Sequence, residues 1–131
     1  MNNRNEEVLQ VKGLSKSFLF EDQKIDVLHD IELSILEGMS LSIRGDSGCG
    51  KTTLLNLVAR LEIGDCGEIY WGQHKMNARA SCNSKEATLR STFLGVVYQS
   101  YYLIPELDVL ENVLIAGKLS VSYGPGGRDR A

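Results

Sequence analysis

The segment Gly45–Thr52 constrains this chain more than any other stretch, because it matches the phosphate-binding pattern G-x-x-x-x-G-K-[ST]. Its glycines let the backbone approach an anion closely and turn several N–H groups toward it. Lys51 is expected to contact the β- and γ-phosphates of a nucleoside triphosphate, and the Thr52 hydroxyl is expected to ligate Mg²⁺. The pattern therefore predicts a nucleotide site in a fold that places a loop between a strand and a helix.

The residues on either side of the loop support this interpretation. Met39–Ile43 alternates apolar and polar residues and is predicted to be a strand. Thr53–Arg60 is largely apolar and is predicted to be a mostly buried helix. The phosphates would then lie at a helix N-terminus, where unpaired N–H groups and the helix dipole favour negative charge.

The composition narrows the class of protein. The chain has 131 residues, of which 43% are hydrophobic and 24% charged, as in a globular domain with a core. A net charge of −3 provides no basic surface, so nucleic acid is not an expected partner. The apolar runs are too short to cross a membrane, and the polar N-terminus does not resemble a signal peptide. Three cysteines without a C-x-x-C motif fit a reducing cytosol.

Short strands and turns are predicted to alternate along the chain outside the loop and its helix. The first third is expected to be antiparallel, with strands at Val8–Gly13, Ile25–Leu28 and Ile31–Ile35 and turns at Glu21–Lys24 and His29–Asp30. The next elements are expected to be a strand at Glu68–Trp71, a loop at Gln73–Asn83 and a helix at Ser84–Arg90 that Ser84 caps. A buried strand is expected at Gly95–Gln99, beside the strand that precedes the phosphate loop in a parallel sheet. A helix with an acidic N-cap is expected at Asp108–Gly117.

The order of these segments resembles that of ABC-transporter ATP-binding subunits. The family's order is followed by G-D-S-G-C-G-K-T-T-L-L-N, D-C-G-E-I and V-V-Y-Q, and the run Y-Q-S-Y-Y-L-I-P-E-L-D-V-L-E-N-V resembles lipoprotein-releasing and macrolide-export ATPases. The resemblance covers residues 8–119. It implies an α/β fold: a P-loop NTPase (RecA-like) core with an antiparallel β front subdomain, truncated before the helical subdomain is complete.

The resemblance also implies roles for single residues, with ATP and Mg²⁺ as cofactors. Gln99 matches a glutamine that reaches Mg²⁺ and the attacking water, which makes it a metal ligand beside Thr52 and a catalytic residue beside Lys51. Phe18 matches an aromatic residue that stacks on adenine. Two alternatives stay open, that Phe18 packs in the core and that Phe20 contacts adenine. The implied phosphate contacts are Gly45, Asp46, Ser47, Gly48, Cys49, Gly50, Lys51, Thr52 and Thr53.

Two partners are implied by the same resemblance. One is an integral membrane subunit that contacts the chain near Gln99–Pro105, and the other is a second ATP-binding subunit paired head to tail. The chain would then lie at the cytoplasmic face of the inner or plasma membrane. The apolar residues Tyr101, Tyr102, Leu103 and Ile104 suit a partner surface, although they could instead belong to a core.

The sequence also departs from the family. It contains no apolar strand that ends in Asp-Glu, no histidine after Gln99 and no Leu-Ser-Gly-Gly-Gln signature. The simplest expectation is a truncated chain with a disordered N-terminus at 1–7, a partial ATP-binding domain at 8–119 and a foreign or disordered tail at 120–131. Such a chain could bind nucleotide without hydrolysing it. A GTPase or small-molecule kinase is disfavoured, because neither N-K-x-D nor D-x-x-G follows the loop.

Overall fold

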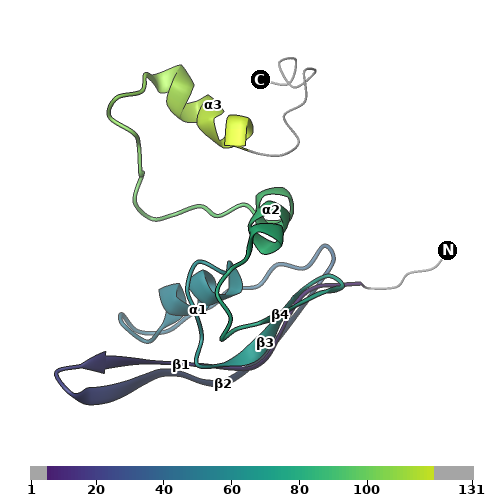
Figure 1. Cartoon of the computed structure of the whole chain (residues 1–131), viewed down its shortest axis with the longest axis vertical. Helices are drawn as coiled ribbons and strands as arrows, with labels where there is room; N and C mark the ends of the chain where they lie inside the picture. Colours follow the sequence, from purple (N-terminus) through teal and green to yellow (C-terminus); the bar gives the residue numbers. More distant parts are fainter. Residues whose placement is uncertain (1–5, 120–131) are drawn as a thin grey trace. The chain divides into compact units, whose positions relative to one another are not determined.

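The computed structural model describes residues 6–119, and the predictions for residues 1–5 and 120–131 lie outside this range. The chain divides into one unit within Met1–Cys82 and a second within Asn83–Ala131 (Figure 1). The first unit contains β1 (Glu7–Phe20), β2 (Gln23–Leu36), α1 (Lys51–Val58), β3 (Cys66–Trp71) and β4 (His74–Asn77), and the second contains α2 (Ser84–Phe93) and α3 (Val109–Leu119).

Four antiparallel strands form one sheet in the order β2-β1-β3-β4. This confirms the antiparallel front that the sequence predicts. The strands β1 and β2 form a long hairpin, and they are joined at Glu21 and Asp22, both of which have a positive φ. The short strands predicted in this region are therefore parts of continuous ones.

The predicted turn at His29–Asp30 is wrong, because these residues lie inside β2. The register between β1 and β2 gains a residue on β1 near Gly13 and one on β2 near Asp30, and both residues have a positive φ. The Asp30 amide donates to Ser15 Oγ at 2.9 Å, and the Gly13 amide donates to Glu32 Oε1 at 2.7 Å. Residue types that favour turns have here produced two β-bulges.

The segment Gln73–Asn83, predicted to be a loop, contains β4. Met76 of β4 lies opposite Ile69 of β3, and both side chains are buried. The burial of this pair explains why a largely polar segment forms a strand, since pairing and packing outweigh composition.

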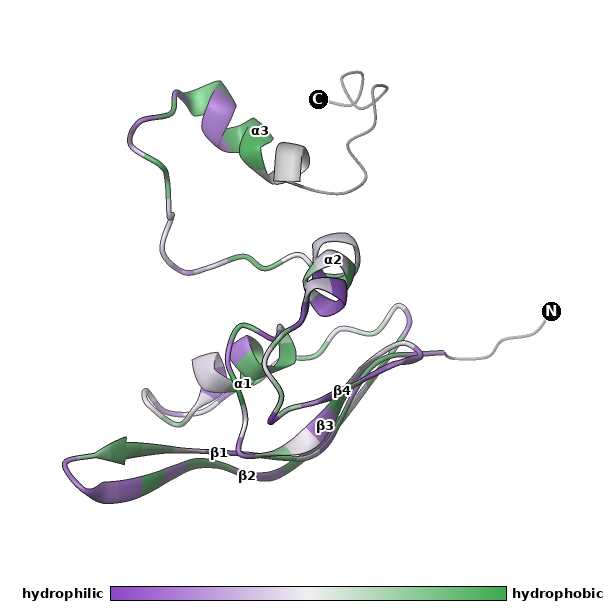
Figure 2. Ribbon diagram, viewed as in Figure 1, coloured by the Kyte–Doolittle hydropathy of each residue, from purple (hydrophilic) through white to green (hydrophobic). Residues whose placement is uncertain are grey.

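The core of the first unit lies between the sheet and α1. Figure 2 shows hydrophobic residues along the hairpin and on α1. Trp71 is fully buried, and its Nε1 donates to the carbonyl oxygen of Val58 at 3.0 Å, so the strand and the helix are joined by packing and by a hydrogen bond. The predicted helix at Thr53–Arg60 is confirmed in the main. The buried hydrophobic residues are Val11, Leu14, Leu28, Leu54, Leu57, Val58, Ala59, Ile69, Trp71, Met76 and Ala78.

Gly67 brings β3 very close to β1. Its φ is +108°, and a Cβ atom on this residue would lie only 2.6 Å from the Cα of Leu14. A side chain at this position would therefore push two strands apart, so the close approach requires glycine.

Two predicted strands do not form. Residues 39–46 and 94–98 have no regular secondary structure, and Val97 is 98% exposed. A strand needs a neighbour for its N–H and C=O groups, and neither segment pairs with another strand within residues 6–119. The predictions that Met39–Ile43 and Gly95–Gln99 form strands, and that the second segment is buried, are therefore wrong for the described residues.

The helices of the second unit begin with side-chain caps. Asn83, rather than the predicted Ser84, caps α2, because its Oδ1 accepts from the Glu86 amide at 2.9 Å. Asp108 caps α3 as predicted: its Oδ1 accepts from the Glu111 amide at 2.8 Å, while Glu111 Oε2 accepts from the Asp108 amide at 3.0 Å. Across residues 6–119, no helix has the length and apolar character needed to cross a membrane.

Candidate functional site

The end of the phosphate loop packs directly on the hairpin. Gly50 is the N-cap residue of α1 and has a φ of +97°. A Cβ atom on Gly50 would lie 2.8 Å from Val27 Cγ1 and 3.1 Å from Leu28 Cδ2. A side chain at this position would collide with β2, so the close packing of the loop on the hairpin favours glycine.

Lys51 is the first residue of α1, and its ammonium group folds back onto the loop. Its Nζ donates to the carbonyl oxygens of Gly45 at 2.8 Å and Asp46 at 2.6 Å, and lies 3.5 Å from Cys49 Sγ. The positive charge is therefore held against the loop backbone, next to the start of the helix.

The N-terminus of α1 differs from those of α2 and α3. Each of the latter begins with a side chain that accepts from a first-turn N–H group and carries an acidic residue in its first turn. In α1 no side chain makes a cap hydrogen bond, and the first turn has no acidic residue. Residues 45–49 and Thr52 are exposed. This helix end can therefore receive an external acceptor, and an anion is the group that it favours.

The residues at this helix end fit a phosphate group and part of a magnesium site. Within residues 6–119, no group of three or more His, Cys, Asp or Glu residues is arranged to hold a metal ion. The Thr52 hydroxyl is a hard oxygen donor of the kind that Mg²⁺ accepts, and Mg²⁺ commonly takes further oxygens from nucleotide phosphates. Gln99, the other predicted ligand, belongs to the second unit and is exposed in a segment without regular structure.

Phe18 lies near the end of β1 and is 39% exposed, so the alternative that it packs in the core is wrong. Phe20, the other candidate for the adenine contact, is 63% exposed. Lys16 lies opposite Leu28 in the hairpin, and its Nζ lies 4.8 Å from the centroid of the Phe18 ring. A Cβ atom on Gly50 would lie beside the Leu28 side chain, so Lys16 and Phe18 belong to the part of the hairpin that lies near the start of α1.

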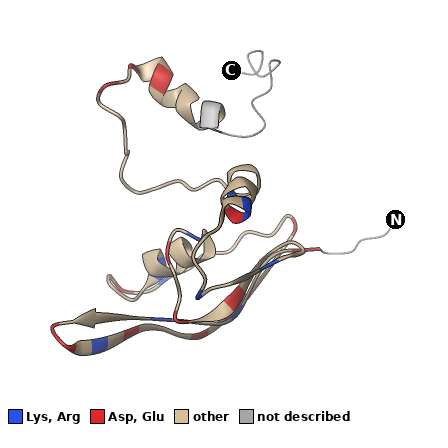
Figure 3. Ribbon diagram, in the orientation of Figure 1, with Lys and Arg blue, Asp and Glu red and all other residues tan. Residues whose placement is uncertain are grey.

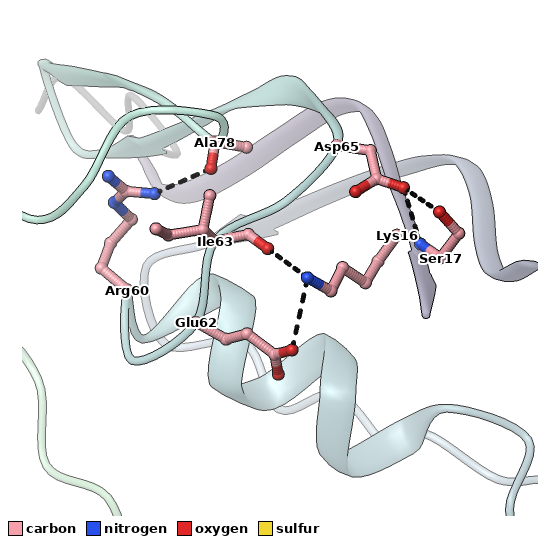
Figure 4. A network of polar contacts seen from close by, with 7 residues as sticks. All are labelled: Lys16, Ser17, Arg60, Glu62, Ile63, Asp65 and Ala78. Atoms are coloured by element: carbon pink, nitrogen blue, oxygen red, sulfur yellow. Dashed lines mark hydrogen bonds and ion pairs between the residues drawn. The ribbon is translucent and has the colours of Figure 1, made fainter. Parts of the chain in front are cut away.

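A polar network beside Phe18 was not predicted from the sequence (Figure 4). Lys16 Nζ donates to the Ile63 carbonyl oxygen at 2.7 Å and lies 3.5 Å from Glu62 Oε1. Asp65 Oδ2 accepts from the backbone N of Ser17 at 2.7 Å and from its Oγ at 2.5 Å, and the side-chain bond is the main cause that lowers the pKa of Asp65. These hydrogen bonds join residues 47 and 48 positions apart, so no local pattern could have revealed them.

Arg60 lies two residues beyond the C-terminal end of α1, and its structural role was also not predicted from the sequence. Its side chain is buried and donates to the carbonyl oxygens of Ala78 at 3.3 Å and Ala80 at 2.6 Å. Elsewhere basic residues pair with acidic ones, as Lys24 does with Asp26 and Lys75 with Glu68. Figure 3 shows residues of both charges along the hairpin of the first unit. The side chains of Arg60, Lys24 and Lys75 therefore bind carbonyl oxygens or carboxylates of this chain.

The predicted partner segment in the second unit is exposed and well braced. Tyr101 is 91% exposed, and Tyr102, Leu103 and Ile104 are also exposed, so the alternative that they form a core is wrong for the described structure. Asn112 donates to the carbonyl oxygens of Ile104, Leu107 and Asp108 and accepts from the Ile104 amide. An apolar hollow of about 330 Å³ is lined by Leu103, Ile104, Pro105, Leu107, Val109, Asn112 and Val113.

Comparison with known sequences identifies the family to which the chain is similar. Residues 28–130 match the protein family described as ABC transporter. The lipoprotein-releasing system ATP-binding protein LolD of Treponema denticola is 40% identical over an alignment of 119 residues that covers 87% of this chain and 51% of that protein. The LolD protein of Francisella tularensis subsp. holarctica is 35% identical over 119 residues, 91% of this chain and 51% of that protein. The chain thus spans about half the length of the curated relatives it matches.

Solved structures are similar over the same extent. The dimeric post-hydrolysis state of the ATP-binding cassette MJ0796, bound to ADP and Pi, has a TM-score of 0.79 and 29% identity, and the match covers 91% of this chain and 50% of that one. A second dimeric structure of MJ0796, described as a bacterial ABC transporter cassette, has a TM-score of 0.75 and 33% identity over 82% of this chain and 46% of that one. The P-loop NTPase fold that the sequence predicts is confirmed.

Proposed function

This chain belongs to the ABC transporter family, and from that premise we propose that it binds MgATP at residues 45–53. The uncapped N-terminus of α1, with Lys51 held beside it, is the observation that carries the proposal. One cation and several N–H donors converge there, which is the chemistry that a β- or γ-phosphate needs. Thr52 and Gln99 are the proposed Mg²⁺ ligands, and Thr53 is a further phosphate contact.

ATP hydrolysis is the proposed reaction of the whole protein. Phosphoryl transfer to water depends mainly on positioning and charge stabilisation, so the residues that matter most are those that hold the phosphates and the attacking water. Lys51 and Gln99 are proposed for these two roles. Stacking of adenine on Phe18 is proposed to complete the nucleotide site, since the ring is partly exposed on the hairpin that packs against the start of α1.

Lys51→Ala tests the phosphate contact. MgATP affinity is expected to fall by at least about 1–2 kcal/mol, because a charge-assisted contact is lost. Lys85→Ala is the matched control: it lies near the start of α2, where Asn83 already caps the helix, and it is expected to leave affinity unchanged. Isothermal titration calorimetry measures the MgATP affinity of the wild type, Lys51→Ala and Lys85→Ala. Equal affinity in the wild type and Lys51→Ala would contradict the proposal.

The adenine contact has its own test. Phe18→Ala is expected to weaken ATP binding, while Phe18→Tyr keeps an aromatic face and is expected to bind as the wild type does. Phe20→Ala separates the two candidates, because Phe20 lies farther along β1 and is the more exposed of the two. If ATP affinity falls in Phe20→Ala and not in Phe18→Ala, Phe20 is the residue that contacts adenine.

The proposed partners are a membrane subunit and a second ATP-binding subunit. The exposed apolar segment near Gln99–Pro105 supports the first, and the relatives that are lipoprotein-releasing ATP-binding proteins make lipoprotein release or export the favoured process. The MJ0796 cassettes are dimeric, which supports a second ATP-binding subunit as a partner, and the pair is proposed to be head to tail. The chain would then lie at the cytoplasmic face of the membrane.

A second candidate is nucleotide binding without turnover by these 131 residues alone. The Asp-Glu strand, the later histidine and the signature are not in the sequence, and groups of this kind contribute about 10²–10³ in rate each. Phosphate release by the purified chain, with Lys51→Ala as the blank, is expected to stay at background. A clear Lys51-dependent turnover would exclude this candidate.

A further inference from the structure

We propose that Lys16 is a positioning residue that orients the ring of Phe18 for the nucleotide base. The proposal rests on the proposed function, in which Phe18 stacks on adenine. It adds a role for a lysine that contacts neither the phosphate loop nor α1 itself through the hydrogen bonds described above.

The ammonium group of Lys16 is fixed by the segment that follows α1. It donates to the Ile63 carbonyl oxygen at 2.7 Å and lies 3.5 Å from Glu62 Oε1, and its side chain is only 15% exposed (Figure 4). The same nitrogen lies 4.8 Å from the centroid of the Phe18 ring, within the range of a cation–π contact. Lys16 therefore covers one face of the ring, and a base would have to stack on the other.

The residue between them is held by the same segment. Asp65 accepts two hydrogen bonds from Ser17, one from the backbone and one from the hydroxyl. Both residues that precede Phe18 are thus bound to residues 62–65, and this segment follows the helix that starts at the phosphate loop. The network links the ring to the loop through α1, and so sets the position of the base-binding face relative to the phosphate-binding end.

A second lysine provides the matched control. Lys75 also lies over an aromatic ring, 5.8 Å from the centroid of Tyr70, and also pairs with a carboxylate, that of Glu68. Its side chain is 57% exposed, whereas that of Lys16 is 15% exposed. The two contacts share their chemistry, but only the Lys16 contact adjoins the proposed base site.

The experiment titrates the wild type, Lys16→Met, Lys16→Arg and Lys75→Met with MgATP and, separately, with magnesium tripolyphosphate. Methionine keeps the apolar stem but removes the cation that fixes the ring. Lys16→Met is expected to weaken MgATP binding by about threefold to tenfold, because the ring must then be ordered upon binding, and to leave tripolyphosphate binding unchanged. Lys16→Arg is expected to restore MgATP affinity, and Lys75→Met to bind both ligands as the wild type does.

Three results would overturn the proposal. Unchanged MgATP affinity in Lys16→Met would show that Lys16 does not orient the Phe18 ring for the base. An equal loss for MgATP and tripolyphosphate means that Lys16 acts on the phosphates or on folding, and an equal loss in Lys75→Met means that any lysine–ring contact has the same effect. Phe18→Ala, titrated in parallel, separates the two hypotheses: if it weakens MgATP binding while Lys16→Met does not, the adenine contact stands and the role of Lys16 fails.

Discussion

The unit with residues 6–82 and the unit with residues 83–119 are built in different ways. The first packs a sheet on α1, and it contains every buried residue of the described structure. The second has no buried residue among those whose burial is described, yet its helices have well-formed caps. The first unit therefore takes its shape from contacts between distant parts of the sequence, whereas the second is specified by contacts within a few residues.

The largest expected effect tests the core of the first unit. Trp71→Ala is expected to lower the free energy of unfolding by about 3–5 kcal/mol, because it leaves a cavity and removes the hydrogen bond to Val58. Val97→Ala, at a 98% exposed position of the second unit, is expected to change it by less than about 0.5 kcal/mol. Trp71 is the only tryptophan, so urea unfolding should be followed by circular dichroism. Similar losses of unfolding free energy in both variants would contradict this difference between the two units.

The close approach of β3 to β1 provides the next test. Gly67→Ala is expected to cost about 2–4 kcal/mol, since left-handed strain adds to the steric clash with Leu14. Gly72→Ala is the control: its φ is +55°, but a Cβ atom there would have no neighbour within 4 Å. About 1–2 kcal/mol is expected for it from strain alone. If chemical denaturation shows the same loss of unfolding free energy in both variants, the close approach of β3 to β1 does not account for the cost at Gly67.

Asn112 tests whether the second unit is held locally. Asn112→Ala removes the hydrogen bond to the Ile104 amide and three bonds to carbonyl oxygens. A loss of about 1–2 kcal/mol is expected for this segment, seen as roughly 5- to 30-fold faster hydrogen exchange of the Ile104 amide. The Leu54 amide, bonded to Gly50 in α1, is expected to exchange at its wild-type rate. Faster exchange at both amides would contradict the local account.

The smallest expected effect concerns pH. The pKa of Asp65 is lowered, chiefly by the hydrogen bond from the Ser17 side chain, so the folded state favours the carboxylate. The stability from Asp65 is therefore fully present above its ordinary pKa of about 4 and is lost as pH falls through the lowered value. Because the group is exposed, the change should be modest.

Thermal unfolding of Asp65→Asn from about pH 6 to pH 2 is expected to show a weaker dependence on acid than the wild type does. Ser17→Ala removes the donor in place of the acceptor and is expected to flatten the same pH range. A wild-type acid dependence in both variants would contradict this origin of the effect.

Features whose signals lie within a few residues can be predicted from the amino-acid sequence alone. The pattern at Gly45–Thr52 predicted a loop that leads into a helix, and α1 begins at Lys51. Asp108 was predicted to cap the last helix, and its side chain does so. The order of motifs also predicted the family and its fold, which the comparisons confirm. The roles of single site residues stay predictions, because a motif names the chemistry but does not measure it.

The pairing of segments, and the contacts of residues across the sheet, depend on the three-dimensional packing of the chain. Gly13 and Asp30 look like turn residues in isolation, but the two long strands absorb them as bulges. Met39–Ile43 has the alternation of a strand and yet forms none, because its backbone has no strand to pair with in the described residues. The contacts of Lys16 and Asp65 join positions nearly fifty residues apart. Such contacts depend on how the whole chain packs, and alternation, capping and turn patterns carry information about neighbours in sequence only.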